Sequence, residues 1–267
     1  MAAQKSPSGK LIMDTEGPIT TITLNRPEAH NALDRELSQD LNDALKEVNV
    51  DRECRILVLT GAGDTFCAGD DVKEFNDWEP SDLQWQLRLY QETVTLLENL
   101  MPVTVAVVDG VCTGGGLELT LASDFVVATP RSRWGMPEIN WDITPGWGGT
   151  AKIAKYAGRR KAKEWNLLGT LFSGQKAERY DLVNRLVEPE DLQSEVDQLI
   201  AILLSKDPTA MRCTKYFLDH GADLDFANVM AFEGAPQRKP FGEGVRDFIE
   251  RDSRDKRREL LDGFWFD

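Results

Sequence analysis

Two glutamates have the residue type and the setting for acid–base chemistry. Glu118 follows Gly114-Gly115-Gly116, about one turn into a helical run, and Glu138 lies 20 residues later in a loop rich in turn formers. Taken singly, the first can simply complement a helix dipole and the second can be a solvated loop charge. If both face one pocket, two carboxyls can divide the roles of acid and base.

The three glycines stand where a strand is expected to pass into a helix. Such a junction lets the backbone approach a ligand closely and leaves N–H groups free for a phosphate or a developing oxyanion. A purely structural tight turn explains the run equally well. No Gly-Lys-Ser/Thr follows, so the run is not a P-loop, and the G-x-G-x-x-G pattern of dinucleotide-binding proteins is absent here.

A second candidate loop covers residues 65–75. Small residues precede the acidic pair Asp70-Asp71, and the loop comes after a buried strand. Ligands bind beyond the carboxyl ends of strands in open parallel sheets, so this loop is a plausible part of a site. By itself it indicates no particular reaction.

The elements that must position these loops alternate between strands and helices. Asp34 is a candidate N-cap for a helix that carries apolar residues from Leu37 to Val48, and residues 80–100 form a second amphipathic helix. Strands are expected at residues 18–25, 55–60, 103–108 and 124–129. This alternation predicts an α/β fold with a largely parallel sheet.

Beyond Thr150 the pattern is mostly helical, with one strand-like stretch near residues 182–187. We therefore expect a mobile tail over residues 1–10, a main domain over residues 11–190 and a C-terminal helical region over residues 191–267.

Composition excludes several classes of function. The net charge of −14 disfavours nucleic-acid binding, which needs Lys and Arg to neutralise phosphates. No segment is long and apolar enough to cross a membrane, and the N-terminus has no apolar stretch typical of a secretory signal, so a cytoplasmic protein is expected. The four cysteines fit buried reduced thiols. Only two histidines occur, which argues against a histidine-rich metal site, and no G-x-S-x-G elbow is present.

Several ordered motifs together resemble the crotonase (enoyl-CoA hydratase/isomerase) superfamily over residues 10–260. The matching segments are Leu24-Asn25-Arg26-Pro27-Glu28, Asn31-Ala32-Leu33, residues 66–74, Val108-Asp109-Gly110, residues 114–119, Ala122-Ser123-Asp124, Pro137-Glu138-Ile139 and residues 145–150. The resemblance implies a crotonase-like ββα spiral core with a C-terminal helical trimerisation region. It also implies an acyl-CoA substrate, no separate cofactor and a homotrimer or homohexamer.

The resemblance also implies roles for individual residues. The backbone N–H groups of Asp70 and Gly115 would form the oxyanion hole, although the family often has alanine at the first position. Glu118 and Glu138 match the two hydratase glutamates, without indicating which is acid and which is base. The remaining matches are Gly146 for positioning water and Ala29, His30, Ala68, Asp71 and Val72 for binding coenzyme A.

The acyl group is less determined. Trp147 replaces a small residue beside Gly146, which predicts a small acyl pocket and a short enoyl chain of the crotonyl or methylthioacryloyl type. A rival hypothesis makes Trp147, Trp141 and Trp134 a wall for an aryl group, as in hydroxycinnamoyl-CoA hydratase-lyases, and these tryptophans could also be core residues. Thioester hydrolysis and a non-catalytic role are further alternatives.

Residues 241–248 resemble the trimerisation element of the family. The chain ends in Gly263-Phe264-Trp265-Phe266-Asp267, and three exposed aromatics would be unfavourable in water. We therefore expect them to pack on a neighbour or to cover the acyl pocket.

Overall fold

The computed structural model describes residues 3–222 and 224–234. The chain divides into two compact units, residues 1–206 and 207–267. Each is described by itself below.

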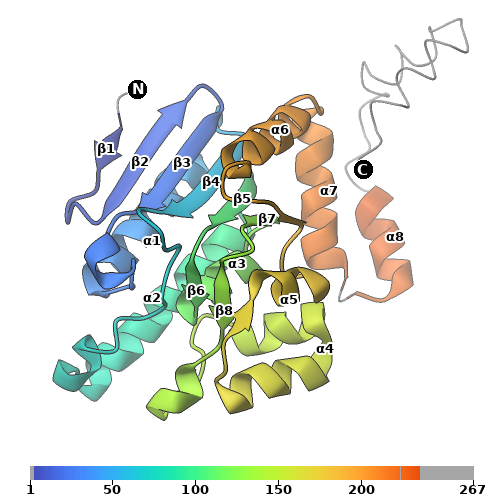
Figure 1. Cartoon of the computed structure of the whole chain (residues 1–267). Helices are drawn as coiled ribbons and strands as arrows, with labels where there is room; N and C mark the ends of the chain where they lie inside the picture. Colours follow the sequence, from blue (N-terminus) through green and yellow to red (C-terminus); the bar gives the residue numbers. More distant parts are fainter. Residues whose placement is uncertain (1–2, 223, 235–267) are drawn as a thin grey trace, which may run out of the picture. The chain divides into compact units, whose positions relative to one another are not determined.

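The first unit is built around a seven-stranded sheet with the strand order β1-β2-β3-β4-β5-β7-β10 (Figure 1). Its strands are β1 (Gln4–Lys5), β2 (Leu11–Glu16), β3 (Ile19–Leu24), β4 (Ile56–Gly61), β5 (Val103–Val108), β7 (Phe125–Ala128) and β10 (Arg185–Leu186). The pairs from β3 to β10 are parallel, while β1, β2 and β3 pair antiparallel. The predicted, largely parallel sheet is therefore confirmed, with an antiparallel edge.

That edge corrects the expectation of a mobile N-terminal tail over residues 1–10. Gln4 pairs with Met13 and Lys5 pairs with Ile12. A tight turn makes this pairing possible, since the Gly9 N–H donates to the Ser6 carbonyl and the Ser6 N–H donates to the Leu11 carbonyl, both at 2.9 Å. Residues 1–2 lie outside the described part of the chain.

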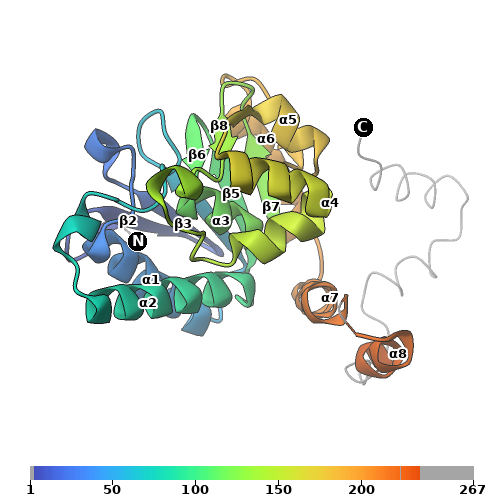
Figure 2. The same cartoon turned by 90° about the horizontal axis from the view of Figure 1, so that it is seen from below.

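Two long helices connect the central parallel strands. In α1 (Arg35–Val50), the predicted N-cap is confirmed, because Asp34 accepts a hydrogen bond from the Leu37 N–H at 2.8 Å. The second helix, α2 (Pro80–Glu98), begins with a capping box between Glu79 and Asp82. The two helices lie side by side on one face of the sheet (Figure 2).

A short helix, α3 (Gly115–Leu121), lies near the centre of the first unit and contacts both α2 and α4 (Figures 1 and 2). It follows β6 (Val111–Thr113), which belongs to a three-stranded sheet with β8 (Arg133–Gly135) and β9 (Phe172–Ser173). Gly116 is required here, because an added Cβ would lie 2.3 Å from the Cys67 carbonyl oxygen. All seven residues of α3 are buried, so the tight packing fixes the helix and everything attached to it.

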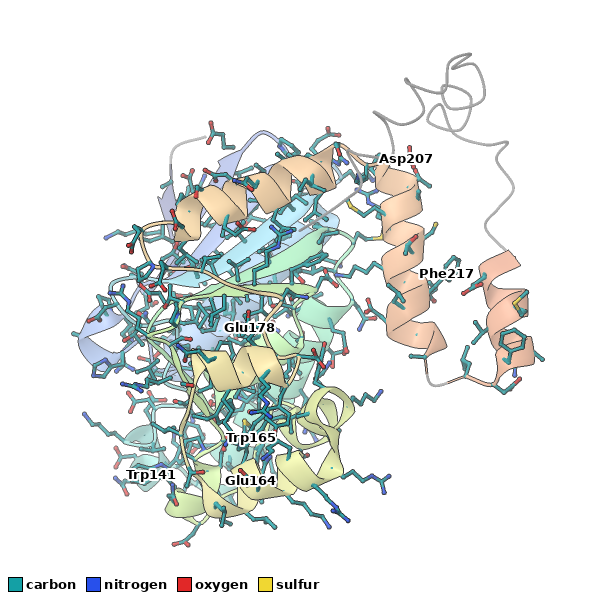
Figure 3. The ribbon with its side chains drawn as sticks, turned by 45° about the vertical axis from the view of Figure 1, so that its right-hand side comes forward. Trp141, Glu164, Trp165, Glu178, Asp207 and Phe217 are labelled. Carbon is teal, nitrogen blue, oxygen red and sulfur yellow. The ribbon has the colours of Figure 1, made fainter. Side chains whose placement is uncertain are left out.

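Two further helices, α4 (Gly149–Leu168) and α5 (Gly174–Arg179), cover the three-stranded sheet (Figure 1). Trp165 of α4, labelled in Figure 3, is fully buried. Its ring stacks on that of Phe172 in β9 with centroids 4.1 Å apart. The helix bends at Gly158, whose φ of 77° interrupts the helical backbone. Three short 3-10 helices complete the unit, η1 (Pro27–Ala29), η2 (Glu74–Asp77) and η3 (Glu138–Trp141).

The boundary between the units lies one helix later than the expected division at residue 190. The helix α6 (Leu192–Leu204) belongs to the first unit, because it buries four apolar residues and Glu195 forms an ion pair with Arg185 of β10. The second unit begins at Asp207 (Figure 3) and contains α7 (Pro208–Gly221) and α8 (Phe226–Gly234). The predicted trimerisation element and the aromatic C-terminus lie outside the described residues.

None of the helices in the described ranges combines the length and the apolar character that crossing a bilayer requires.

Candidate active site

Two loops meet at the start of α3. Gly69 has a φ of 92°, and a Cβ added to it would lie 3.2 Å from the Gly115 nitrogen and 3.3 Å from the Gly114 Cα. Gly114, the N-cap of α3, also has a positive φ of 54°. Glycine at both positions lets the loop after β4 and the loop after β6 touch through their backbones.

This contact brings together the N–H groups of Asp70 and Gly115. Leu33 pairs with both neighbours of Asp70, because its N–H donates to the Gly69 carbonyl at 2.8 Å and its carbonyl accepts from the Asp71 N–H at 3.1 Å. Successive peptide groups of an extended strand point to opposite sides, so the Asp70 N–H points away from Leu33. Neither the Asp70 N–H nor the Gly115 N–H donates to another group in the described part of the chain.

A pocket opens at this junction, with about 310 Å³ of free space that is partly open to solvent. Its walls come from both loops and from the segment around η3. The lining residues are Ala68, Gly69, Asp70, Val72, Gly114, Gly115, Pro137, Glu138, Trp141 and Ile143. Five residues with a predicted role therefore line the pocket, namely Ala68, Asp70, Val72, Gly115 and Glu138, together with Trp141 of the proposed aryl wall.

Glu118 lies behind the pocket and is held firmly. Its Oε1 accepts hydrogen bonds from the Trp147 N–H at 3.0 Å and from the Gly149 N–H at 2.6 Å. Gly149 begins α4, so this carboxyl group also faces the positive end of a helix dipole. The side chain is 1% exposed, and its Oε2 has no partner among the described residues. One oxygen is thus fixed while the other stays available.

Glu138 lines the pocket directly from the first residue of η3. A Cβ added to Gly114 would lie 3.2 Å from its Oε1, which places this carboxyl beside the start of α3. The side chain is 7% exposed, and neither oxygen has a hydrogen-bond partner among the described residues. A buried carboxyl without partners is unfavourable, which indicates that a water or ligand normally completes it.

Burial changes the titration of both glutamates. It raises the pKa of Glu118 to about 8, with smaller contributions from the charges of Glu138 and Asp70, although the two backbone donors oppose the rise. Burial likewise raises the pKa of Glu138 to about 7, and the charge of Asp70 adds to this effect. The pair can therefore hold one proton near neutral pH, which suits a site that needs one acid and one base.

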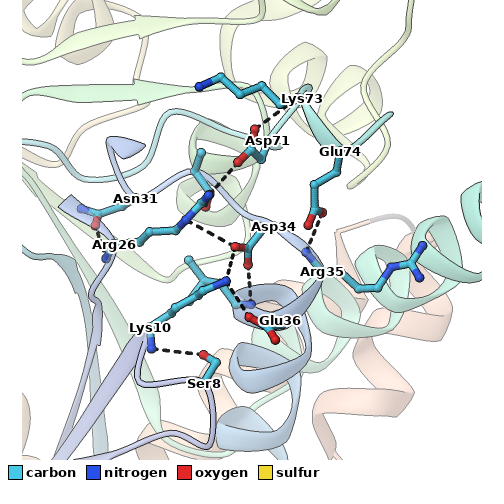
Figure 4. Close-up of polar contacts among 12 residues, drawn as sticks. Ser8, Lys10, Arg26, Asn31, Asp34, Arg35, Glu36, Asp71, Lys73 and Glu74 are labelled. Carbon is cyan, nitrogen blue, oxygen red and sulfur yellow. Dashed lines mark hydrogen bonds and ion pairs between the residues drawn. The ribbon is translucent and has the colours of Figure 1, made fainter. Parts of the chain in front are cut away.

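The predicted coenzyme A loops lie on one side of the pocket and are tied to each other. Ala68 donates its N–H to the His30 carbonyl at 3.0 Å. Arg26 bridges the two loops, since its Nη1 donates to the Ala32 carbonyl at 3.1 Å and to Asp71 at 2.7 Å (Figure 4). Ala68 and Val72 line the pocket, and Ala29 ends η1. This arrangement is compatible with binding of coenzyme A along one side of the pocket, and the roles of these residues remain predictions.

The three tryptophans of the proposed aryl wall do not lie together on the pocket. Trp134 is buried and donates its indole N–H to Ser132 at 2.7 Å. Trp147 is also fully buried and stacks on Tyr90, with ring centroids 4.3 Å apart. Only Trp141 lines the pocket, and it is 58% exposed. Trp147 restricts the site from behind instead of forming its wall.

Gly146 stands beside α2, where an added Cβ would lie 3.0 Å from the Leu87 Cδ2. Its predicted part in holding water stays a prediction. The neighbouring backbone donors, Trp147 and Gly149, are the ones that bind Glu118. No pattern in the amino-acid sequence indicated these two contacts, because they depend on how α4 meets α3.

The side chain of Asp70 is a further feature that the sequence analysis missed. Its Oδ1 accepts a hydrogen bond from the Trp147 Nε1 at 3.1 Å. Burial raises the pKa of Asp70 to about 6, against the opposing effects of the Trp147 indole and the Tyr90 hydroxyl. The Tyr90 hydroxyl is near enough to influence this pKa but lacks good hydrogen-bond geometry. The only signal in the sequence was that subsets of the resembled family have alanine at the position of Asp70.

Comparison with known proteins identifies the family of this chain. The family model described as enoyl-CoA hydratase/isomerase matches residues 14–256. A crotonyl-CoA hydratase from Syntrophomonas wolfei is 31% identical, covering 90% of this chain and 95% of the relative. A short-chain-enoyl-CoA hydratase from Clostridium acetobutylicum is also 31% identical, over 87% and 88%. A hydroxycinnamoyl-CoA hydratase-lyase from Pseudomonas fluorescens is 34% identical, over 76% of each chain.

Solved structures confirm the predicted fold class. An enoyl-CoA hydratase from Bacillus anthracis superposes with a TM-score of 0.84 at 30% identity, covering 90% of this chain and 96% of that one. A Thermobifida fusca structure in complex with acetoacetyl-CoA gives a TM-score of 0.79 at 27% identity, covering 84% and 91%. The α/β core and the matches over most of the chain agree, and this protein belongs to the enoyl-CoA hydratase/isomerase family.

Proposed function

We propose that this protein adds water to a short-chain 2-enoyl-CoA thioester, using Glu118 and Glu138 as the acid–base pair. The observation that carries the proposal is the convergence of the Glu138 carboxyl and two unused backbone N–H groups on one pocket, with the buried Glu118 carboxyl behind it. Each glutamate keeps at least one oxygen without a partner among the described residues. Coenzyme A enters as part of the substrate, and no further cofactor is invoked.

The reaction assigns each group one task. The ionised glutamate takes a proton from water while the water oxygen bonds to C3 of the enoyl group. The displaced electron pair moves to the thioester oxygen as an enolate, which accepts hydrogen bonds from the N–H groups of Asp70 and Gly115. One such donor is typically worth about 2.7–4 kcal/mol in the transition state. The protonated glutamate then delivers its proton to C2. One proton of the water stays on the new C3 hydroxyl group and the other is left on the glutamate that acted as base. Transfer of that proton back to the acid restores the starting state of the pair.

The short chain is supported by what surrounds the acyl end. Trp147 is fully buried and stacked on Tyr90, so this region offers no room without displacing a core aromatic pair. The loops that carry Ala68, Asp71 and Val72 would hold the coenzyme, and the exposed Lys73 ammonium is suited to a phosphate.

The test is a panel of enoyl-CoA thioesters from C4 to C10, with mass spectrometry of the products. We expect the hydrated product to form fastest from the C4 substrate. A preference for C10 would overturn the short-chain assignment, and the absence of a hydrated product from every thioester would overturn the reaction itself. A Glu118→Ala variant with unchanged turnover would show that Glu118 is not one of the two acid–base groups.

Cleavage after hydration is a second candidate, because Trp141 offers an exposed indole on the pocket wall to an aryl acyl group. Feruloyl-CoA and similar aryl thioesters should then yield an aldehyde, seen by mass spectrometry. Hydrolysis of the thioester would instead release free coenzyme A, which a thiol reagent detects.

The proposed function also includes assembly of the protein into a homotrimer or homohexamer. Leu167 and Leu168 at the end of α4 and Leu171 just before β9 are each more than half exposed, as expected for residues that a second copy covers. Light scattering coupled to size exclusion would measure the assembly, and a monomer at micromolar concentration would contradict it.

A further inference from the structure

The carboxyl group of Asp70 is not needed for the oxyanion hole, which uses only its backbone N–H. It nevertheless lies within the same cluster. A Cβ added at Gly115 would be 3.4 Å from the Asp70 Oδ1 and 3.1 Å from the Trp147 Nε1. The side chain is surrounded by protein but keeps a small exposed area that lines the pocket. A third carboxyl therefore stands beside the point where the enolate charge develops.

Trp147 connects this carboxyl to Glu118. Its indole N–H donates to the Asp70 Oδ1 at 3.1 Å, and its backbone N–H donates to the Glu118 Oε1 at 3.0 Å. The ring is stacked on Tyr90 with an interplanar angle of 18°, which leaves it little freedom to move. The loop that carries one oxyanion donor is thus linked to a catalytic glutamate by a single residue held at both ends.

The charges around Asp70 are of one sign. Glu118 faces it from α3 and Glu138 from η3, while the Tyr90 hydroxyl of α2 and the Cys67 thiol of its own loop are neutral. The Arg26 guanidinium, which is bound to the neighbouring residue Asp71, is also engaged by Asp34. No ion pair within residues 3–222 and 224–234 includes Asp70, Glu118 or Glu138.

We propose that the Asp70 side chain is a positioning residue, which fixes Glu118 through Trp147 and whose negative charge sets the pH range in which the two glutamates share a proton. This inference rests on the proposed function for its effect on turnover, but its effect on the two glutamates exists without substrate.

The order of titration supports the electrostatic part. The pKa of Asp70, at about 6, lies below those of Glu138 and Glu118, at about 7 and 8. Asp70 is therefore already ionised while the glutamates titrate. A nearby negative charge disfavours a second one, so it raises the pKa of both glutamates and moves the working range upward.

Asp70→Asn tests this directly, because an amide oxygen still accepts the Trp147 indole N–H while the charge is lost. Infrared difference titration of the substrate-free protein follows the two glutamates, with bands assigned by Glu118→Gln and Glu138→Gln. We expect both midpoints to fall by about one pH unit. Asp43→Asn, on the exposed face of α1, removes the same charge far from the site and should leave the midpoints unchanged.

The positioning part is tested by comparing Asp70→Ala with Asp70→Asn. Alanine removes both the charge and the acceptor, so kcat for enoyl-CoA hydration should fall about 10- to 100-fold further than in the asparagine variant, with little change in KM. Equal kcat values in the two variants would overturn the link through Trp147. The kcat-against-pH profile of Asp70→Asn should move to lower pH together with the infrared midpoints.

Unchanged midpoints in Asp70→Asn would overturn the charge effect, whether or not the protein hydrates an enoyl-CoA. Shifted midpoints in a protein that hydrates no enoyl-CoA would instead refute the proposed function and leave the charge effect standing. If Asp70→Asn does not fold, Asp70→Ser serves the same comparison, because it is uncharged and smaller.

Discussion

Glu118 and Glu138 have the same side chain and face the same chemistry, but the protein surrounds them differently. Glu118 is fixed by two backbone donors at the start of α4 and lies behind the pocket. Glu138 lines the pocket, and neither of its oxygens has a partner among the described residues. One glutamate is held by the protein, while the other is left to be completed by water or substrate. Four predictions test this difference.

The largest effect should come from removing either carboxyl. Glu118→Gln and Glu138→Gln should each lower kcat for hydration by about 10²–10⁴-fold, because each removes one proton-transfer group. The double variant should be little worse than either single one, since the two act as a unit. Steady-state kinetics on the best enoyl-CoA measure this. If the loss in kcat of the double variant equalled the product of the two single losses, the glutamates would work independently.

The second prediction concerns Glu118, the glutamate that the backbone of α4 holds in place, and not Glu138. A Cβ at position 149 would lie 2.7 Å from both the Cγ and the Oε1 of Glu118. Gly149→Ala should therefore displace Glu118, together with the Met136 Cε at the same distance of 2.7 Å, and lower kcat by up to about 100-fold. Gly221→Ala is the matched control, since the nearest atom to its added Cβ is 4.0 Å away. Wild-type kcat in Gly149→Ala would show that the contact with α4 is dispensable.

Stability against pH should also distinguish the pair. Both carboxyls have a raised pKa when folded, so their ionisation destabilises the fold as pH rises from the unfolded value of about 4.5 through about 8 for Glu118. In the wild-type protein, the ionisation of Glu118 should lower the free energy of unfolding by roughly 3 to 5 kcal/mol between pH 5 and pH 9, and Glu118→Gln should abolish this loss. Glu138→Gln should remove less, because its pKa is about 7. Urea unfolding at both pH values measures the difference.

The smallest effect is in the wild-type pH profile. Hydration needs one glutamate ionised and the other protonated, so kcat/KM should be bell-shaped with limbs near pH 7 and pH 8. Activity should fall toward pH 5 as the base is protonated, and toward pH 10 as the acid loses its proton. A flat profile from pH 5 to 10 would contradict the shared proton.

Sequence reasoning predicted the elements that carry these groups well, where the local pattern was strong. The helix capped by Asp34 and the strands near residues 19–24, 56–61 and 103–108 appear as expected, because capping and β-branched runs are local signals. The short strands of the second sheet were missed, since two or three residues leave no periodicity to detect. The N-terminal pairing was missed because it depends on β2, which was not predicted.

The sequence by itself determined the family, the two glutamates and the two candidate loops, since these are fixed residue types at fixed spacings. Only the tertiary structure decided what each glutamate meets. The donors of Glu118 come from residues 147 and 149, about 30 positions away, and the partner of Trp147 is Asp70 on another loop. The structure likewise put Trp147 in the core and left Trp141 on the pocket. Burial and hydrogen bonding between distant segments arise only when the chain closes, and they set the pKa values on which the chemistry depends.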